Sequence, residues 1–335
     1  MKEALLYGVR DLRVVESPKP EIGPYDVLVR VRACGICPTD LRKYLLLHES
    51  AQVPHLPLNM GHEFAGDVVE VGAKVTRPIK VGMRVAASDY GGYAEYARLG
   101  PCRTEEDIAI EAIDTVFELP ENVSYEEGTL MEPLACAIHA VRDQAKIQVG
   151  QTVAILGSGQ MGLLKMGVAQ AMGARVIMVD LREDRLAWAV KLGADETVNA
   201  STEDPVAAVR RLTHGEGAEA VIVSPGRVPE MIPQALGMAA YLGRVVLFGG
   251  YKKGTSVPFD PNVIHYGEII LTGCEGIGVK PSPTDLLTFK IALDLIASGR
   301  VPVSKIITHT FPLDEITVAF GVLERMEAMK VVLKI

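Results

Sequence analysis

The sequence predicts an α/β protein of two domains, in which a mainly β first part is followed by a doubly wound parallel sheet. Three observations support this prediction. Short alternating strands punctuated by glycines fill the chain up to about residue 120. From about residue 148, apolar strands alternate with helical stretches. The 335 residues also exceed what one compact core usually holds.

Composition narrows the class of protein. Apolar residues make up 48% of the chain and charged residues 23%, which is ordinary for a soluble globular enzyme. A net charge of −8 offers no basic surface for nucleic acid or anionic membranes, so we expect small-molecule partners. No targeting segment or membrane-length apolar run is evident, and five cysteines argue against a disulfide framework. We therefore expect a cytoplasmic protein.

The first part alternates between strands and turns. The predicted strands cover residues 26–32, 67–71, 82–86 and 91–96. Ser124 with Glu127 forms a capping box that opens a helix, and Pro133 interrupts or restarts that helix. Residues 103–112 are acidic and helix-prone, and we expect them to form a solvated helix face.

The second part has the order strand, helix, strand, helix. Strands are predicted at residues 153–156, 175–179, 220–223, 244–248 and 268–271, and helices at 161–172, 182–192, 205–213 and 231–241. Such alternation indicates right-handed βαβ units. A helix at 284–298 and a strand at 330–334 are expected to return to the first domain. The expected domains are therefore 1–147 and 148–275, with 276–335 as the return segment.

A glycine-rich turn follows the first strand of this second part. The turn consists of Gly157, Ser158, Gly159, Gln160, Met161 and Gly162. Its first glycine allows the tight turn, its second lets the backbone approach a pyrophosphate, and its third lets the helix pack against the strand. The N-terminus of that helix then presents free N–H groups to phosphates. This context predicts a dinucleotide site.

Asp180 closes the next strand and is placed to bind an adenosine ribose. Its carboxylate would repel a 2′-phosphate, so the predicted cofactor is NAD. Arg182 and Arg185 lie just beyond and would favour the phosphorylated cofactor instead. Arg185 is retained as a candidate cofactor contact.

Candidate metal ligands occur in the first part. Cysteine and histidine are typical zinc ligands, and a catalytic zinc takes three protein ligands with one open position. Cys37 and His62 supply two. Glu132 is a third candidate, because the following proline restricts its backbone.

These motifs resemble those of the medium-chain dehydrogenases, in the zinc-dependent alcohol and polyol dehydrogenase branch that includes sorbitol and threonine dehydrogenases. The similar segments are 37–40, 61–66 with Gly72 and Val75, 131–133, and the glycine turn. The resemblance implies a GroES-like catalytic domain and a Rossmann NAD-binding domain. It also implies Cys37, His62 and Glu132 as zinc ligands, Glu63 beside the metal, and Asp40 holding the His62 ring.

Two departures from the family pattern affect the expected site. The four-cysteine lobe that binds a structural zinc in many relatives is absent, since only residues 86–90 fill that gap. We expect one catalytic zinc per subunit. Arg42 stands where many relatives have a proton-relaying histidine, and arginine is a poor general base. We therefore expect the substrate proton to leave through Thr39 and then water or the cofactor ribose hydroxyls, and Arg42 is a candidate contact to an anionic group or to the cofactor phosphates.

The predicted reaction moves a hydride from the secondary alcohol of a small polar molecule to NAD. The substrate classes are a polyol, sugar derivative, cyclitol or amino alcohol, with L-threonine 3-dehydrogenase as the nearest alternative. A zinc-free quinone or enoyl reductase and a non-catalytic binding protein on the same fold are further alternatives. The resemblance also implies a homotetramer or homodimer, with the strand edge near residues 269–272 as the candidate contact.

Overall fold

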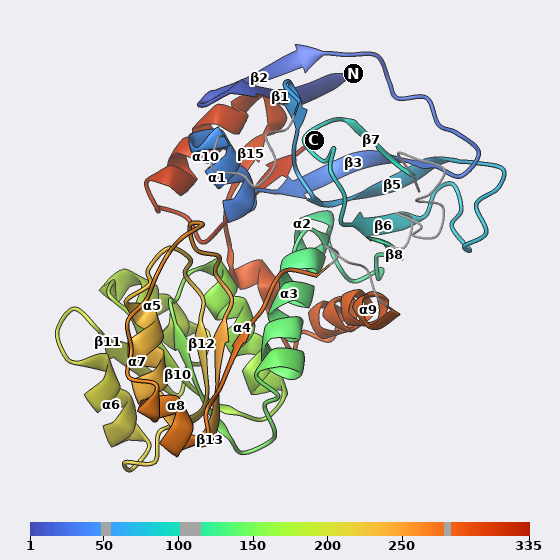
Figure 1. The fold of residues 1–335 in the computed structure, drawn as a ribbon. Coiled ribbons are helices and arrows are strands. Elements are labelled where there is room, and N and C mark those ends of the chain that lie inside the picture. Colours follow the sequence, from blue (N-terminus) through green and yellow to red (C-terminus); the bar gives the residue numbers. More distant parts are fainter. Residues whose placement is uncertain (48–54, 101–114, 278–282) are drawn as a thin grey trace. The chain divides into compact units, whose positions relative to one another are not determined.

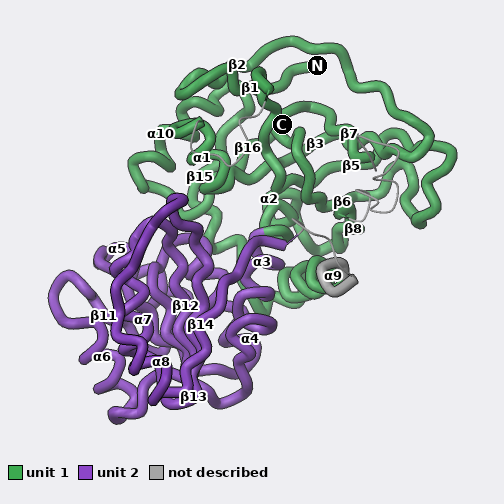
Figure 2. Tube along the Cα trace, in the orientation of Figure 1, with its two compact units in different colours: residues 1–132, 280–335 green, residues 133–279 purple. Residues whose placement is uncertain are grey.

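The computed structural model describes residues 1–47, 55–100, 115–277 and 283–335 and has two compact units (Figure 2). The first unit contains Met1–Glu132 and Lys280–Ile335, and the second contains Pro133–Val279. Residues 133–147, which we expected in the first domain, belong to the second unit. Two hydrogen bonds to strands of the second unit hold these residues there. Arg244 Nε donates to the Gln144 carbonyl at 2.7 Å, and Thr272 donates to the Gln144 side chain at 3.2 Å. The acidic segment 103–112 lies outside the described residues.

The first unit is built on two sheets (Figure 1). The small sheet has the order β2-β1-β4, and the large one has the order β15-β16-β3-β5-β6-β8, with β7 also paired to β3. The strands are β1 (Lys2–Gly8), β2 (Asp11–Glu16), β3 (Val27–Gly35), β4 (Leu58–Asn59), β5 (Glu63–Val71), β6 (Arg84–Ala87), β7 (Tyr96–Leu99), β8 (Val116–Glu118), β15 (Ile307–Pro312) and β16 (Lys330–Lys334). The expected return segment reaches the first unit as β16, which pairs with β3.

The central pairing of the first unit positions the site described below. β3 pairs antiparallel with β5, with Gly35 opposite Glu63, and β16 pairs antiparallel with β3 on its other side, with Val332 opposite Gly35. Residues from three distant parts of the sequence therefore meet at the end of β3. The strand expected at 91–96 is shorter, because only Ala94 forms a bridge, to Glu3, before β7 begins at Tyr96.

Helices pack on and between these strands. They are α1 (Pro38–Leu45), α2 (Tyr125–Gly128), α9 (Pro283–Ala297) and α10 (Ile316–Glu324). Phe320 of α10 packs against the rings of Tyr44 and Tyr93, at centroid distances of 5.0 and 6.2 Å. The predicted capping box is confirmed, since Ser124 accepts from the Glu127 backbone and Glu127 accepts in return. The next helix, α3 (Met131–Ile138), restarts two residues before Pro133 and runs into the π-helical turn η4 (His139–Gln144).

The second unit is a six-stranded parallel sheet in the order β11-β10-β9-β12-β13-β14 (Figure 1). Its strands are β9 (Thr152–Leu156), β10 (Arg175–Asp180), β11 (Glu196–Asn199), β12 (Ala218–Val223), β13 (Ala239–Leu247) and β14 (Ile270–Gly273). Its helices are α4 (Gln160–Ala171), α5 (Glu183–Lys191), α6 (Pro205–Leu212), α7 (Met231–Met238) and α8 (Asn262–Gly267). The doubly wound prediction is confirmed.

The strand order reverses next to β9, which lies between β10 and β12. In such sheets, ligands bind beyond the carboxyl ends of the strands at this reversal, where the glycine turn also lies. The helix expected at 231–241 ends at Met238, because β13 begins at Ala239. In the part of the chain that the structure describes, no helix has both the length and the apolar character to traverse a membrane.

Candidate metal centre and dinucleotide-binding turn

A cysteine, a histidine and a carboxylate converge at the end of β3. One ligand atom from each of Cys37, His62 and Glu63 lies within 4.8 Å of the others. Cys37 is the N-cap of α1, and its sulfur accepts the Thr39 backbone N–H at 3.4 Å. Glu63 opens β5, and its register opposite Gly35 brings it to the turn that leads into Cys37. Thiolate, imidazole and carboxylate are the donor set that zinc prefers, so these residues fit that ion.

Burial and charge act against each other in this group. Burial raises the pKa of the Cys37 thiol, and Glu63 raises it further, while His62 lowers it. Burial lowers the pKa of His62, but Asp40 and Cys37 outweigh this effect and raise it well above the usual value. The group thus holds several acceptors close together and attracts positive charge, whether proton or metal.

Asp40 lies directly behind His62 on the first turn of α1. Its Oδ2 accepts the Tyr93 hydroxyl at 2.8 Å, and its Oδ1 lies 3.5 Å from His62 Nδ1. Asp40 Oδ1 and His62 Nδ1 are both buried, and neither has a hydrogen-bond partner. Second-layer carboxylates of this kind orient ligating histidines. A small movement of the imidazole would complete that contact.

Glu63 has a buried counter-charge that sequence reasoning missed. Lys330 Nζ, from the first residue of β16, donates to Glu63 Oε2 and also to the Ile36 carbonyl at 3.2 Å. Lys330 is 0% and Glu63 1% exposed. The two residues are 267 positions apart, and the only sequence signal was a lysine opening an apolar strand.

The other predicted site residues in the first unit are more dispersed. Glu132, expected as the third ligand, is half-buried near the start of α3 and is not part of the Cys37, His62 and Glu63 group. It is the last residue of the first unit, where the chain passes into the second. Thr39 is half-buried next to Cys37, and Arg42 is exposed.

The glycine turn has the geometry predicted for it. Gly157 has φ +91°, a conformation that favours glycine. A Cβ on Gly162 would lie 1.8 Å from the Gly157 carbonyl oxygen, so the helix packs as closely as expected. Around Gly159 no atom lies within 4 Å of a Cβ position. The backbone is therefore open to a ligand there.

Two polar side chains of this turn are buried and unsatisfied. Ser158 Oγ and Gln160 Nε2 have no hydrogen-bond partner, although the residues are only 0% and 6% exposed. Buried polar atoms are normally paired. The unpaired atoms and the open backbone at Gly159 fit a phosphate-bearing ligand at the start of α4.

Asp180 closes the turn at the end of β10. Its carboxylate accepts the Ser158 N–H at 2.6 Å and the Arg182 N–H at 3.0 Å. The Arg182 guanidinium pairs with Asp184 at 2.7 Å. Arg185 is half-buried on α5, where burial and nearby Arg182 lower its pKa. Met161 is the second residue of α4. The predicted cofactor residues thus surround one turn.

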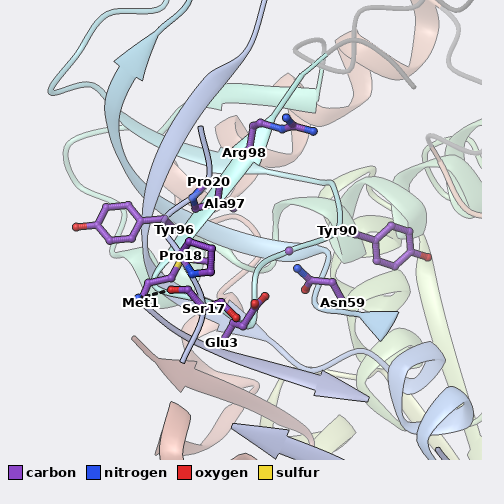
Figure 3. Close-up of a pocket in the computed structure, with 11 residues that line it drawn as sticks. Met1, Glu3, Ser17, Pro18, Pro20, Asn59, Tyr90, Tyr96, Ala97 and Arg98 are labelled. Atoms are coloured by element: carbon purple, nitrogen blue, oxygen red, sulfur yellow. Dashed lines mark hydrogen bonds between the residues drawn. The ribbon is translucent and has the colours of Figure 1, made fainter. Parts of the chain in front are cut away.

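A separate pocket of about 370 Å³ lies in the first unit, near the small sheet. Figure 3 shows Tyr90 and Asn59 on one side of it, and Met1, Ser17, Pro18 and Tyr96 on the other. The Met1 ammonium donates a hydrogen bond to the Ser17 carbonyl at 2.7 Å. Tyr90 connects this region with the group formed by Cys37, His62 and Glu63, called the metal group below. Its ring packs edge-on against His62 at a centroid distance of 5.6 Å.

Comparison with known proteins matches both units. Residues 23–108 match the family described as alcohol dehydrogenase GroES-like domain, and residues 161–297 match the family of zinc-binding dehydrogenases. A sorbitol dehydrogenase from Bombyx mori is 30% identical, with 99% of this chain and 98% of that protein aligned. A D-arabitol-phosphate dehydrogenase from Enterococcus avium is also 30% identical, with coverage of 98% and 95%.

Two further relatives extend the comparison. An L-threonine 3-dehydrogenase from Bacillus subtilis is 32% identical, with 96% of this chain and 94% of that protein aligned. The crystal structure of 2R,3R-butanediol dehydrogenase from Bacillus subtilis superposes with a TM-score of 0.83 at 28% identity, covering 100% and 99% of the two chains.

The fold and the site define a two-unit, zinc-type dehydrogenase. The chain belongs to the zinc-dependent alcohol and polyol dehydrogenase branch of the medium-chain dehydrogenases. It is an NAD-dependent, zinc-containing oxidoreductase of the alcohol and polyol class.

Proposed function

We propose that the protein transfers a hydride between NAD and the secondary alcohol of a small polar molecule, such as a polyol, sugar derivative, cyclitol or amino alcohol. One observation carries this proposal: Cys37, His62 and Glu63 converge in the unit that matches the catalytic domain. Zinc, when bound, makes an alcohol hydroxyl more acidic, and NAD accepts the hydride.

Cys37, His62 and Glu132 are the proposed zinc ligands. The carboxylate of Glu63 already has a buried cation at contact distance, the Lys330 ammonium. A carboxylate neutralised in this way is better suited to stand beside the metal than to ligate it. Asp40 acts behind His62 and fixes the orientation of the ring, which its buried Oδ1 faces at 3.5 Å.

Thr39 is the proposed first acceptor of the substrate proton. It is half-buried and adjoins Cys37 in the first turn of α1, and a hydroxyl both accepts and donates a proton. Arg42 is exposed and permanently charged, so it does not serve as a base. The proton then passes from Thr39 to water.

The glycine turn and Asp180 are the proposed NAD site in the second unit. The backbone at Gly159 and the unpaired groups of Ser158 and Gln160 would hold the pyrophosphate. Asp180 would bind the adenosine ribose, and its negative charge favours NAD over NADP. Arg185 remains a proposed contact to the same half of the cofactor.

L-threonine 3-dehydrogenase is the second candidate, favoured by 32% identity to an enzyme of that name. The names of the relatives include neutral, phosphorylated and amino-acid substrates, so family membership leaves the charge of the substrate open. A zinc-free quinone or enoyl reductase does not account for Cys37 beside His62. A non-catalytic binding protein does not account for the zinc group together with the glycine turn.

We also propose a cytoplasmic homodimer or homotetramer. β14 is the edge strand of the six-stranded sheet, and Ile270 on it is 47% exposed. Tyr266, just before it, is 75% exposed. An apolar strand edge of this kind can pair with its copy across a two-fold axis. Light scattering of the wild type and Ile270→Arg tests this contact.

The main test measures NADH formation over polyols, cyclitols, L-threonine and simple alcohols, with zinc-loaded and chelator-stripped protein. We expect turnover only with zinc, and loss of turnover in Cys37→Ala and His62→Ala. Zinc content by mass spectrometry tests the ligand assignment: Glu132→Ala loses the ion, whereas Glu63→Gln keeps it. Full zinc-dependent turnover in Cys37→Ala would refute the proposal.

A further inference from the structure

Lys43 is a cation near the metal group, and its hydrogen-bond partner, the Tyr90 hydroxyl, carries no charge. It lies in the last turn of α1, half-buried, and its Nζ donates to the Tyr90 hydroxyl at 2.9 Å. No carboxylate of the described residues lies within 4.0 Å of it. Lys19 offers a contrast: it also lies over a tyrosine, Tyr96, but Glu70 pairs with it at 2.6 Å. The Lys43 charge attracts the buried Asp40 carboxylate, but the ammonium donates only to the uncharged Tyr90 hydroxyl among the described residues and can still bind an anion.

Tyr90 connects this charge to the metal group. Its ring packs edge-on against His62 at 5.6 Å, and Lys43 Nζ lies 4.3 Å from the centroid of the same ring. These distances place the ammonium within about 10 Å of the imidazole. This upper bound is comparable with the full length of an extended six-carbon polyol that carries a terminal phosphate. The ammonium is thus within reach of the far end of a substrate oxidised beside His62.

The overall charge of the protein makes a local cation significant. At −8, the chain as a whole repels anions. Glu63 and Lys330 neutralise each other, so the pair adds no net positive charge to the site. Asp40 is buried and faces His62 and Tyr93, and its carboxylate attracts the Lys43 ammonium without forming an ion pair with it. Lys43 is half-buried, unlike the exposed Arg42 beside it, and an ammonium binds phosphate or carboxylate as a point charge.

We propose that the substrate is an anionic polyol or sugar derivative, and that Lys43 binds its terminal phosphate or carboxylate. This inference rests on the proposed function, because it places the carbon that is oxidised next to His62. It makes Lys43 a specificity-determining residue. Tyr90 orients the ammonium by accepting one hydrogen bond from it, which leaves the other two N–H groups for the substrate anion.

The test compares matched pairs that differ only in the terminal group. The probes are sorbitol 6-phosphate with sorbitol, D-arabitol 1-phosphate with D-arabitol, and L-idonate with L-iditol. With zinc-loaded full-length protein, we expect kcat/KM at least about tenfold higher for one anionic member, mainly through KM. Lys43→Met should bring the ratio of anionic to neutral substrate close to one, whereas Lys43→Arg retains most of it. The phosphate and carboxylate arms identify the anion.

Lys74→Met is the matched control, because Lys74 lies 5.4 Å from the Tyr25 ring and is exposed, and it should keep the wild-type ratio. A neutral substrate preferred by the wild type, or a ratio unchanged in Lys43→Met, would overturn the inference while leaving the proposed function intact. If no compound is turned over, the proposed function fails. Calorimetric binding of sorbitol 6-phosphate and D-arabitol 1-phosphate then tests whether Lys43 binds the anion. Binding that is lost in Lys43→Met supports its role, and equal or absent binding refutes it.

Discussion

The Lys330 ammonium and the Glu63 carboxylate form an ion pair sealed from solvent at the metal group, with exposed fractions of 0% and 1%. Two charges removed from water are stable only together, because each alone loses its hydration. The pair joins the last strand of the first unit to the strand that follows His62.

Replacing Lys330 with Met should destabilise the first unit by about 3–5 kcal/mol, because Glu63 is then buried without a counter-charge. Calorimetry of the chelator-stripped protein measures the loss. Adding Glu63→Gln to this variant should restore part of it. The control is Lys334→Met, which breaks the exposed pair with Glu126 and should cost less than about 1 kcal/mol. Equal losses in the two single variants would contradict the importance of burial.

Asp40→Asn should weaken zinc binding by about 10- to 100-fold, because the neutral amide supports the His62 ring less strongly. Competition with a chromogenic chelator gives the affinity. Tyr93→Phe removes the hydroxyl that holds Asp40 and should have a smaller effect in the same direction. Asp11→Asn, at an exposed aspartate paired with Arg13, serves as the control and should bind zinc like the wild type. Unchanged affinity in Asp40→Asn would remove Asp40 from the site.

Asp180→Ser should shift the cofactor preference toward NADP by at least about tenfold in the ratio of kcat/KM values, equivalent to about 1.4 kcal/mol. The substitution removes the negative charge that repels a 2′-phosphate while Arg182 and Arg185 remain nearby. Steady-state kinetics with both cofactors measures the shift, with the exposed Glu216→Gln as control. A preference that does not move would mean that Asp180 serves only to hold the Ser158 and Arg182 N–H groups.

Lys165 should make the stability of the second unit depend on pH. It is fully buried on α4, donates to Ser224 at 2.8 Å and lies 3.3 Å from the Phe248 ring centroid. Burial lowers its pKa from 10.5 to about 7, and each unit of such a shift corresponds to about 1.4 kcal/mol. Between pH 7 and 10.5 the unfolded chain binds a proton that the folded chain has released, so stability rises with pH in this window.

The measurement is urea unfolding from pH 6.5 to 9.5, followed by the fluorescence of Trp188, the single tryptophan, which lies in the second unit. Relative to Lys165→Met, the wild type should gain a few kcal/mol as the pH rises. The exposed Lys253→Met should follow the wild-type curve. Parallel curves for the wild type and Lys165→Met would show that Lys165 keeps its proton when folded.

Sequence reasoning predicted the second unit more fully than the first for a physical reason. βαβ units are local in sequence, and the glycine turn is a pattern of adjacent residues, so both are visible without knowledge of tertiary contacts. β1 and β2 were not predicted, because the two residues between them, Val9 and Arg10, are neither glycine nor asparagine, although Arg10 has φ 58°. β11 and α8 were also missed and have only four and six residues, whereas β15 and α10 were missed although they are no shorter than elements that were predicted.

The residues of the candidate site also differ in how far the sequence predicts them. Cys37, His62 and Glu63 occur in compact motifs, which made them candidates from the sequence, and the structure brings them together. Lys330 and Tyr90 are not part of any motif, and only the strand pairing and the turn before Gly91 bring them to the metal group. Lys43 was passed over because a charged residue in the last turn of a helix is usually a solvated one. Its significance depends on the absence of a carboxylate partner among the described residues.

The order of β16 within the large sheet has a consequence for synthesis on the ribosome. The second unit is one continuous stretch and can fold while the chain is still being made. The first unit is interrupted by it, and β16, which completes its sheet, is translated after the whole second unit. Until then Glu63 has no Lys330 to neutralise it. A ribosome-bound chain therefore carries an unfinished metal pocket with one uncompensated acid, and maturation of the metal site must wait for translation to reach β16.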